Sequence, residues 1–222
     1  MKSRIATNLR TDKPPISKGE FWDRMVGCLL TTQQRSGPGS TVAKFLRTKP
    51  LPLNYPICAK QDDLAEFTRA VLSNFGGVRR STIIGKELAA NMSFLRDGGW
   101  EPTLRQLDDL RTNSSPETEK RAAAFIADSF KGFGPKQSRN LLQALGLSRF
   151  EIPIDSRITK WLNTIGFPVK LTANALQDRN YYNFVSDGFQ KLCEACDITP
   201  CVLDAVIFSS FDEGKWTEEN VV

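Results

Sequence analysis

The 222 residues contain 40% hydrophobic and 25% charged side chains, proportions typical of a folded protein rather than a disordered one. Lysine and arginine outnumber aspartate and glutamate by 30 to 25, and the resulting charge of +5 mildly favours a polyanionic partner. Histidine is absent, which excludes Ser-His and Cys-His nucleophile systems and leaves acid–base chemistry to carboxylates, lysine or tyrosine.

Helical periodicity dominates the first half of the chain. The apolar residues of 17–33 fall on one face of a helix with Ser17 as its N-cap, and the glycine- and proline-containing stretch 35–40 ends this helix. The next helix is predicted to run to about Thr48. The same apolar spacing predicts further helices around residues 64–71, 78–96 and 102–111.

The second half of the chain has the same character. Ser115 and Pro116 form an N-cap and first-turn pair that opens a helix ending at Phe130. Asp155 caps another helix, and the remaining helices are predicted over residues 136–145, 180–196 and 200–211. No alternating strand pattern, internal repeat or obvious linker interrupts the sequence. We therefore predict an all-α fold in which residues 1–222 form a single unit.

The stretch KGFGPKQSRNLLQALG follows the helix that ends at Phe130. Its glycines, Gly132 and Gly134, can adopt positive φ angles and bring bare backbone close to a neighbour. The helix that follows presents free N–H groups to an anion, and beside Lys131 and Arg139 the natural anion is a DNA phosphate. A plain tight turn between packed helices is the alternative explanation of the same glycines.

A lysine and an aspartate add chemistry to this hairpin. Lys136 lies at the start of the second helix, where the helix dipole and loss of solvent disfavour an ammonium and favour a nucleophilic amine. Asp155 lies 155 − 136 = 19 residues later, at the next helix start, after a turn that can bring it back towards the lysine. An amine beside a carboxylate suits attack at a sugar C1′, where positive charge develops as a base departs. Asp155 also fits a simple N-cap, and the two roles are compatible.

The cysteines support a competing hypothesis. Cys193, Cys196 and Cys201 could belong to a metal or iron–sulfur site, but such a site needs four thiolates or a histidine, and the other cysteines lie far away in sequence. The preferred interpretation is that these side chains pack as small apolar groups. Neither a metal nor another cofactor is therefore expected.

The hairpin stretch, followed by IPIDSR, resembles the signature of the helix-hairpin-helix-GPD superfamily of DNA glycosylases. In that superfamily a lysine after the second glycine marks the bifunctional members, which remove a base and then nick the strand. The segments CLLTTQQRS and ITPCVLDAVIFSSFDEGKW are similar to parts of the compact archaeal and bacterial 8-oxoguanine glycosylases. The resemblance implies a fold of two helical lobes with the active-site cleft between them and a helix-hairpin-helix at about residues 117–146.

The resemblance also implies roles for individual residues. Lys136 corresponds to the Schiff-base nucleophile, Asp155 to the essential carboxylate, and Gln33 to the residue that fills the gap left by an extruded base. Contacts to DNA are implied for residues in or near the hairpin: Lys131, Gly132, Phe133, Gly134, Arg139 and Arg157. The implied partner is double-stranded DNA containing a damaged base, bound by a monomer. Because the sequence shows neither a signal peptide nor a spanning segment, we expect a cytoplasmic, nucleoid-associated protein of prokaryotic type.

Departures from the family bear on the substrate. Many members have histidine where this chain has Arg157, and the four-cysteine loop of the endonuclease III branch is missing. The missing loop, together with the hairpin stretch and the similarity of the C-terminal segment, favours 8-oxoguanine opposite cytosine, sensed through an acceptor for its N7–H. The alternatives are a superfamily member acting on another base, a monofunctional glycosylase, and a non-catalytic DNA-binding module. Aromatic residues placed to sandwich a base are Phe133, Trp161, Phe208 and Trp216, although core packing is the favoured role of each.

Overall fold

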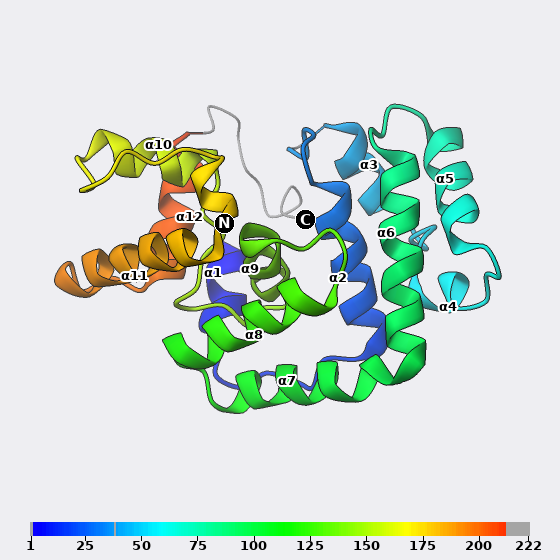
Figure 1. The fold of residues 1–222 in the computed structure, drawn as a ribbon, viewed down its shortest axis with the longest axis horizontal. Coiled ribbons are helices and arrows are strands. Elements are labelled where there is room, and N and C mark those ends of the chain that lie inside the picture. Colours follow the sequence, from blue (N-terminus) through cyan, green and yellow to red (C-terminus); the bar gives the residue numbers. More distant parts are fainter. Residues whose placement is uncertain (1, 38, 212–222) are drawn as a thin grey trace.

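The computed structural model describes residues 2–37 and 39–211, and every regular element in these ranges is helical (Figure 1). The all-α fold predicted from the sequence is confirmed. In chain order the elements are α1 (Lys2–Leu9), α2 (Lys18–Leu30), α3 (Thr41–Arg47), α4 (Tyr55–Cys58), α5 (Leu64–Phe75), α6 (Ser81–Phe94), the wide turn η1 (Leu95–Gly99), α7 (Trp100–Thr112), α8 (Pro116–Ser129), α9 (Pro135–Ala144), α10 (Ser156–Thr164), the 3₁₀ turn η2 (Ala175–Gln177), α11 (Arg179–Ala195) and α12 (Pro200–Ser210).

Local signals determine most of the helix starts. The Ser17 hydroxyl accepts a hydrogen bond from the Glu20 N–H (3.1 Å) at the start of α2. At the start of α8, Ser115 and Thr118 form a reciprocal capping box, and Pro116 lies between them in the first turn. The predicted helices agree with the observed ones to within a few residues except for the short α1 and α4, which the sequence patterns do not predict.

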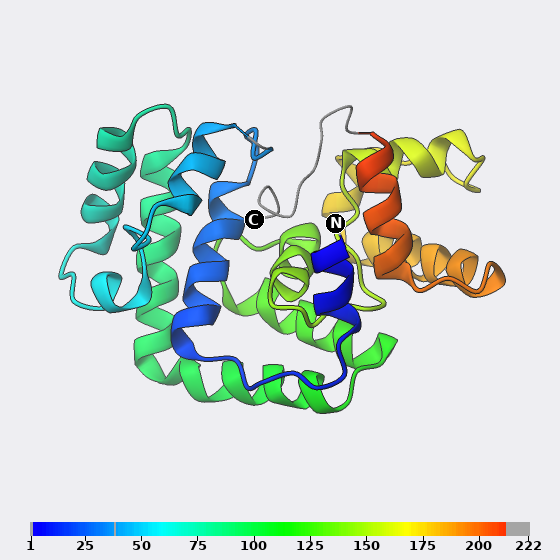
Figure 2. The same cartoon turned by 180° about the vertical axis from the view of Figure 1, so that it is seen from behind.

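The buried apolar side chains of the described residues form two clusters. The first cluster extends from α2 to just beyond α9 and is centred on fully buried residues such as Trp22 and Leu29. The second cluster involves the segment after α9 together with α10, α11 and α12, and its centre includes Tyr182 and Phe189. Figures 1 and 2 show α2–α6 on one side of the molecule, α10–α12 on the other, and α9 between them.

The helix α1 lies at the boundary between the two clusters and contacts α12 (Figure 2). Its C-terminal end is tied to the chain just after α9, because Asn8 Oδ1 accepts a hydrogen bond from the Ser148 N–H (3.1 Å). The Arg149 guanidinium donates to the carbonyls of Asn8, Leu9 and Arg10 at 3.1–3.3 Å. These bonds satisfy carbonyl groups that have no partner within α1. Tertiary contacts therefore hold a helix whose own sequence signal is weak.

Within residues 2–37 and 39–211, none of the helices combines the length and the apolar character needed to traverse a lipid bilayer.

Candidate active site

The turn between α8 and α9 is fixed by the first cluster. The Lys131 N–H donates to Asn91 Oδ1 (2.7 Å) and the Lys131 carbonyl accepts from Asn91 Nδ2 (3.1 Å), so a single buried amide holds the backbone from both sides. Gly132 has a φ of +84°, and a Cβ atom there would lie 2.5 Å from Leu29 Cδ2. The turn therefore requires glycine at position 132, while the Lys131 side chain extends into solvent.

Gly134 differs from Gly132, because no contact with the described residues requires glycine at position 134. Its backbone is extended, and a Cβ atom would meet no described atom within 4 Å. Gly134 is the N-cap of α9, whose first turn begins with Pro135 and receives no hydrogen bond from a capping side chain. The start of α9 therefore has no side-chain cap among the described residues, and free N–H groups at a helix start are a feature that binds anions.

Lys136 follows at the second position of α9, and its side chain is exposed. The sequence analysis expected Lys136 to lie at a helix start and to be shielded from solvent. The first expectation agrees with the structure, and the second does not. The next residue, Gln137, is buried and fastens α9 to the end of α2 by donating to the Cys28 carbonyl (2.9 Å) and to the Thr32 hydroxyl. Lys136 thus carries an exposed amine next to an anchored residue of α9.

A cleft of about 550 Å³ is lined by both Lys136 and Asp155. One wall comes from α2 and α9 of the first cluster, and the other comes from α12 and the start of α10. Other lining groups that could contact a ligand are Arg4, Asp23, Asn140, Gln143, Asp204 and Phe208. The structure therefore brings together the nucleophile and the carboxylate inferred from the sequence.

Asp155 serves as the N-cap of α10 and also lines this cleft. Its Oδ1 accepts hydrogen bonds from the N–H groups of Arg157 (2.8 Å) and Ile158 (3.1 Å), while its Oδ2 lies 3.2 Å from Arg157 Nη1. The side chain retains 23% of its accessible surface. One carboxylate oxygen is thus occupied by capping, and the other is paired with Arg157, which also lines the cleft.

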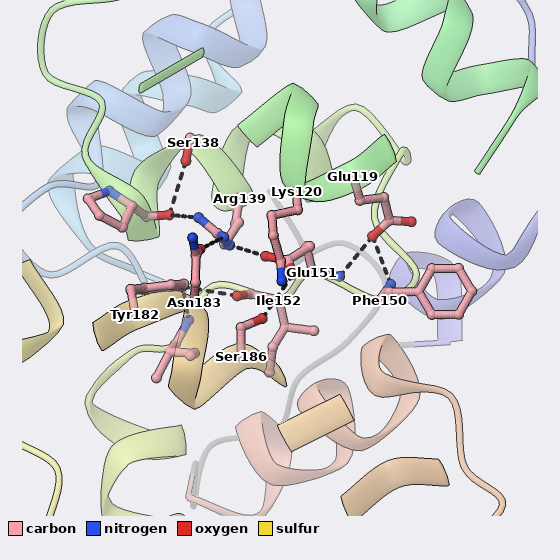
Figure 3. A network of polar contacts seen from close by, with 12 residues as sticks. Glu119, Lys120, Ser138, Arg139, Phe150, Glu151, Ile152, Tyr182, Asn183 and Ser186 are labelled. Atoms are coloured by element: carbon pink, nitrogen blue, oxygen red, sulfur yellow. Dashed lines mark hydrogen bonds and ion pairs between the residues drawn. The ribbon is translucent and has the colours of Figure 1, made fainter. Parts of the chain in front are cut away.

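Arg139 does not have the role that the sequence analysis gave it. Its side chain is 3% exposed, and its guanidinium pairs with the buried Glu151, donates to Asn183 Oδ1 (2.9 Å) and the Pro135 carbonyl (2.9 Å), and stacks 4.4 Å from the Tyr182 ring centroid (Figure 3). These contacts leave no accessible face for a DNA phosphate. Arg139 is a buried structural residue, because the positive side chain points between the two clusters rather than into solvent.

This buried network connects Lys136 to Asp155. Arg139 lies three residues after Lys136, and its partner Glu151 lies four residues before Asp155. Glu151 also accepts from Ser186 Oγ (3.1 Å) and Gln190 Nε2 (2.9 Å), which secures it to α11. The distance between the lysine and aspartate backbones is therefore held by an ion pair with satisfied hydrogen bonds.

Two further anchors hold the chain segment that leads to Asp155. The buried carboxylate of Glu119 on α8 accepts the N–H groups of Arg149, Phe150 and Glu151, each at 2.8 Å (Figure 3). Burial raises the pKa of Glu119 from its ordinary value, and these hydrogen bonds oppose the rise. At the other end of the segment, the Tyr182 hydroxyl donates to the Ile152 carbonyl (3.0 Å) and accepts from the Ile154 N–H (2.7 Å).

The remaining predicted site residues take different positions. Gln33 is exposed and has a φ of +57°, an uncommon conformation for a residue with a side chain, in the loop whose ends at Thr31 and Ser36 line the cleft. Phe133 is buried against Phe130, with ring centroids 6.4 Å apart, so its side chain packs in the core.

Of the other aromatic candidates, Trp161 packs on Phe189 at 6.4 Å between centroids, and Trp216 lies outside the described residues. Phe208 does line the cleft, with the Arg157 Cζ 4.0 Å from its ring centroid. Arg157 is therefore a cleft residue that links Phe208 to Asp155.

The sequence analysis missed Arg4 and Asp204 as cleft residues. The available signal was the spacing of Asp204 and Phe208, which lie one turn apart on the same face of a predicted helix. No sequence signal connects Arg4 to this site, because 200 positions separate it from Asp204.

The cysteines do not gather into a site. Cys193 and Cys201 are buried, and burial raises the pKa of their thiols to about 12 and about 11 respectively. Cys196 is exposed and not disulfide-bonded. Within residues 2–37 and 39–211, no three or more histidine, cysteine, aspartate or glutamate side chains are placed to hold a metal ion.

No family model and no curated protein matches this sequence. Among solved structures, the chain is similar to the crystal structure of the 8-oxoguanine DNA glycosylase of Methanocaldococcus jannaschii, with a TM-score of 0.68. The match covers 97% of this chain and 86% of the archaeal enzyme at 15% sequence identity. This chain has the fold of that glycosylase. The resemblance drawn from the hairpin signature is thus confirmed for the fold, and the chemistry depends on the residues of the cleft.

Proposed function

We propose that this protein is a DNA glycosylase that removes a damaged base and then cleaves the strand through Lys136. The observation that carries the proposal is that Lys136 and Asp155 line one cleft of about 550 Å³, in a chain with the fold of a known DNA glycosylase. A module that only binds DNA would need no carboxylate opposite the lysine. The proposal accounts for both residues.

In the proposed reaction, the amine of Lys136 attacks C1′ of the damaged nucleotide. The N-glycosidic bond breaks, its electron pair leaves with the base, and the carboxylate of Asp155 stabilises the positive charge that develops on the sugar. Asp155 also takes up the proton that the amine loses. The sugar ring then opens as O4′ takes the proton held by Asp155, which leaves a protonated imine between C1′ and Lys136. The departed base, as its anion, accepts the C2′ proton, and the electron pair of that C–H bond expels the 3′ phosphate.

The turn before Lys136 supplies the DNA contacts. The open start of α9 at Gly134 and the exposed ammonium of Lys131 would bind phosphates of one strand. Gln33, presented by its loop at the edge of the cleft, would occupy the stack vacated by the extruded nucleotide. A monomer suffices for these contacts, and the partner is duplex DNA with one damaged base.

For the lesion we propose 8-oxoguanine, whose N7–H donates where guanine accepts. The cleft contains acceptors of the required kind in the side-chain amides of Asn140 and Gln143. An acceptor positioned for the new N–H would be left unpaired against normal guanine, and that unpaired group provides the selectivity. Phe208 is an aromatic residue of the cleft lining, and its ring already lies against the Arg157 and Arg4 guanidinium groups.

Borohydride trapping on duplexes that each carry one lesion tests the proposal. We expect a covalent complex with the 8-oxoguanine–cytosine duplex, little with duplexes containing uracil, thymine glycol or alkylated adenine, and none with Lys136→Gln. Undiminished trapping by Lys136→Gln would refute the Schiff-base assignment. Stronger trapping on another lesion would assign a different substrate and leave the lysine chemistry intact.

A further inference from the structure

The N-terminal helix contributes a guanidinium to the cleft. Arg4 pairs with Asp204 of α12, and both line the cleft together with Lys136 and Asp155. The Arg4 Cζ also lies 5.3 Å from the centroid of the Phe208 ring. Only 22% of the Arg4 side chain is exposed, so this ion pair is largely shielded from water and its charges interact strongly.

Arg4 owes its position to the anchoring of α1. Asn8, one turn further along, donates to the Gln143 carbonyl (3.3 Å) and accepts from the Ser148 N–H (3.1 Å). These bonds fix α1 against the end of α9, and Arg4 then lies on the turn of α1 nearest Asp204. Arg4 therefore pairs with Asp204 because α1 is held in place by its own hydrogen bonds.

Asp204 is a buried carboxylate whose ionisation depends on its neighbours. Its side chain is 4% exposed, and its Oδ2 accepts from Gln143 Nε2 (2.8 Å) as well as from Arg4. Burial raises the pKa of Asp204, the charge of Arg4 and the Gln143 hydrogen bond lower it, and the charge of Asp155 raises it. The titratable or charged groups that act on Asp204 come from every neighbouring helix: Arg4 of α1, Asp155 at the start of α10, Tyr182 of α11 and Cys201 of α12.

We propose that Arg4 is a specificity-determining residue of the base pocket, because it holds Asp204 as an ionised acceptor that selects a base edge carrying N–H donors. The inference rests on the proposed function. The N1–H and amino group of a guanine-type lesion satisfy an ionised carboxylate, whereas the N1 acceptor of an adenine-type base leaves it unpaired. A protonated carboxylic acid would donate to that acceptor instead, so losing Arg4 should relax the preference towards adenine-type bases.

The pH dependence of excision tests this inference. Activity that needs ionised Asp204 is present above its pKa and is lost as the pH falls through it. Removing the positive charge in Arg4→Met raises this pKa, so the acidic limb of single-turnover 8-oxoguanine excision should move up by about 1–3 pH units. Arg4→Lys, which keeps the charge, should retain the wild-type limb, and Arg105→Met, which breaks an exposed ion pair on α7, is the charge-loss control.

Two further comparisons separate specificity from folding. Nicking of a duplex with a preformed abasic site should fall less in Arg4→Met than base excision does, because no base remains to be selected. In the Asp204→Asn background, Arg4→Met should no longer shift the acidic limb, since asparagine does not ionise. A shift that persists in that background, or a loss of abasic-site nicking equal to the loss of excision, would overturn the assignment to Asp204.

A spectroscopic titration makes the test independent of turnover. The carboxyl carbon of Asp204, assigned by its absence in Asp204→Asn, should titrate at a higher pH in Arg4→Met than in the wild type or in Arg105→Met. An unshifted midpoint would overturn the coupling between Arg4 and Asp204 whatever the activity. Wild-type protein that excises no base at any pH would instead overturn the proposed function, and the specificity role with it.

Discussion

The two glycines of the hairpin turn are expected to respond oppositely to the same substitution. In Gly132→Ala the new Cβ would lie 2.5 Å from Leu29 Cδ2, and because Leu29 is fully buried its side chain can move only by displacing packed neighbours. In Gly134→Ala the new Cβ would meet no described atom within 4 Å, and the backbone there is already extended. The first glycine is therefore required by the fold, whereas the described fold places no such requirement on the second.

The expected loss of stability for Gly132→Ala has two parts. A residue with a Cβ at a φ of +84° is destabilised by about 1–2 kcal/mol. The collision with a packed core side chain adds about 1–3 kcal/mol, so the total is about 2–5 kcal/mol. In a chain of this length each kcal/mol lowers the melting temperature by about 2–4 °C, which predicts a fall of at least about 4 °C.

Gly166 offers a matched control, because its φ is also +84° but a Cβ there would meet nothing within 4 Å. Thermal and urea unfolding of Gly166→Ala should therefore show the strain of about 1–2 kcal/mol alone. If Gly132→Ala is no less stable than Gly166→Ala, the contact with Leu29 does not constrain the turn and this reasoning is wrong.

Gly134→Ala should keep its melting temperature within about 2 °C of the wild type, as expected for a substitution that strains no contact. Its affinity for an abasic-site duplex, measured by fluorescence anisotropy, should fall by about 10–100-fold, the loss of one or two hydrogen bonds to a charged phosphate. Unchanged affinity would show that DNA does not approach the start of α9.

Three further predictions concern individual side chains. Asp155→Asn should slow single-turnover base release by about 10²-fold or more, because the charge that stabilises the sugar cation is lost. The melting temperature should stay near that of the wild type, because asparagine also caps helices. Base release near the wild-type rate would show that Asp155 acts only as a helix cap. Arg139→Met should lower the free energy of unfolding, measured in urea, by about 3–5 kcal/mol, because Glu151 would be left buried and unpaired. A variant that is as stable as the wild type but binds DNA more weakly would instead indicate that Arg139 contacts a phosphate. Lys131→Ala should reduce the slope of log affinity against log salt by about one, and an unchanged slope would remove Lys131 from the interface.

Much of the fold is readable from the sequence because its signals are local. Serine and proline at the start of α8, the glycines that end it, and the apolar spacing of α2 and α11 each act within a few residues of chain. The capping role of Asp155 is of the same kind, since a side-chain oxygen reaches only the next N–H groups. Such features depend on neighbours that the sequence itself specifies.

Residues in one linear pattern can nevertheless have opposite environments. Lys131, Lys136 and Arg139 form one basic run in the sequence, yet the two lysines are exposed and Arg139 is buried against Glu151. The difference arises because the face of α9 that carries Arg139 is covered by α11, whose position is set by packing over more than 40 residues of intervening chain. Charge alone does not specify which face of a helix becomes covered.

The sequence by itself determined that this chain is helical, that a glycine-containing turn separates two helices just before Lys136, and that Asp155 begins the next helix. Only the tertiary structure decided that lysine and aspartate line one cleft, that Arg139 belongs to the interior, and that α1 brings Arg4 to Asp204. The physical reason is the distance along the chain over which each interaction acts. Caps, turns and periodicity act over a few residues, whereas burial and ion pairing depend on which distant surfaces exclude water from one another.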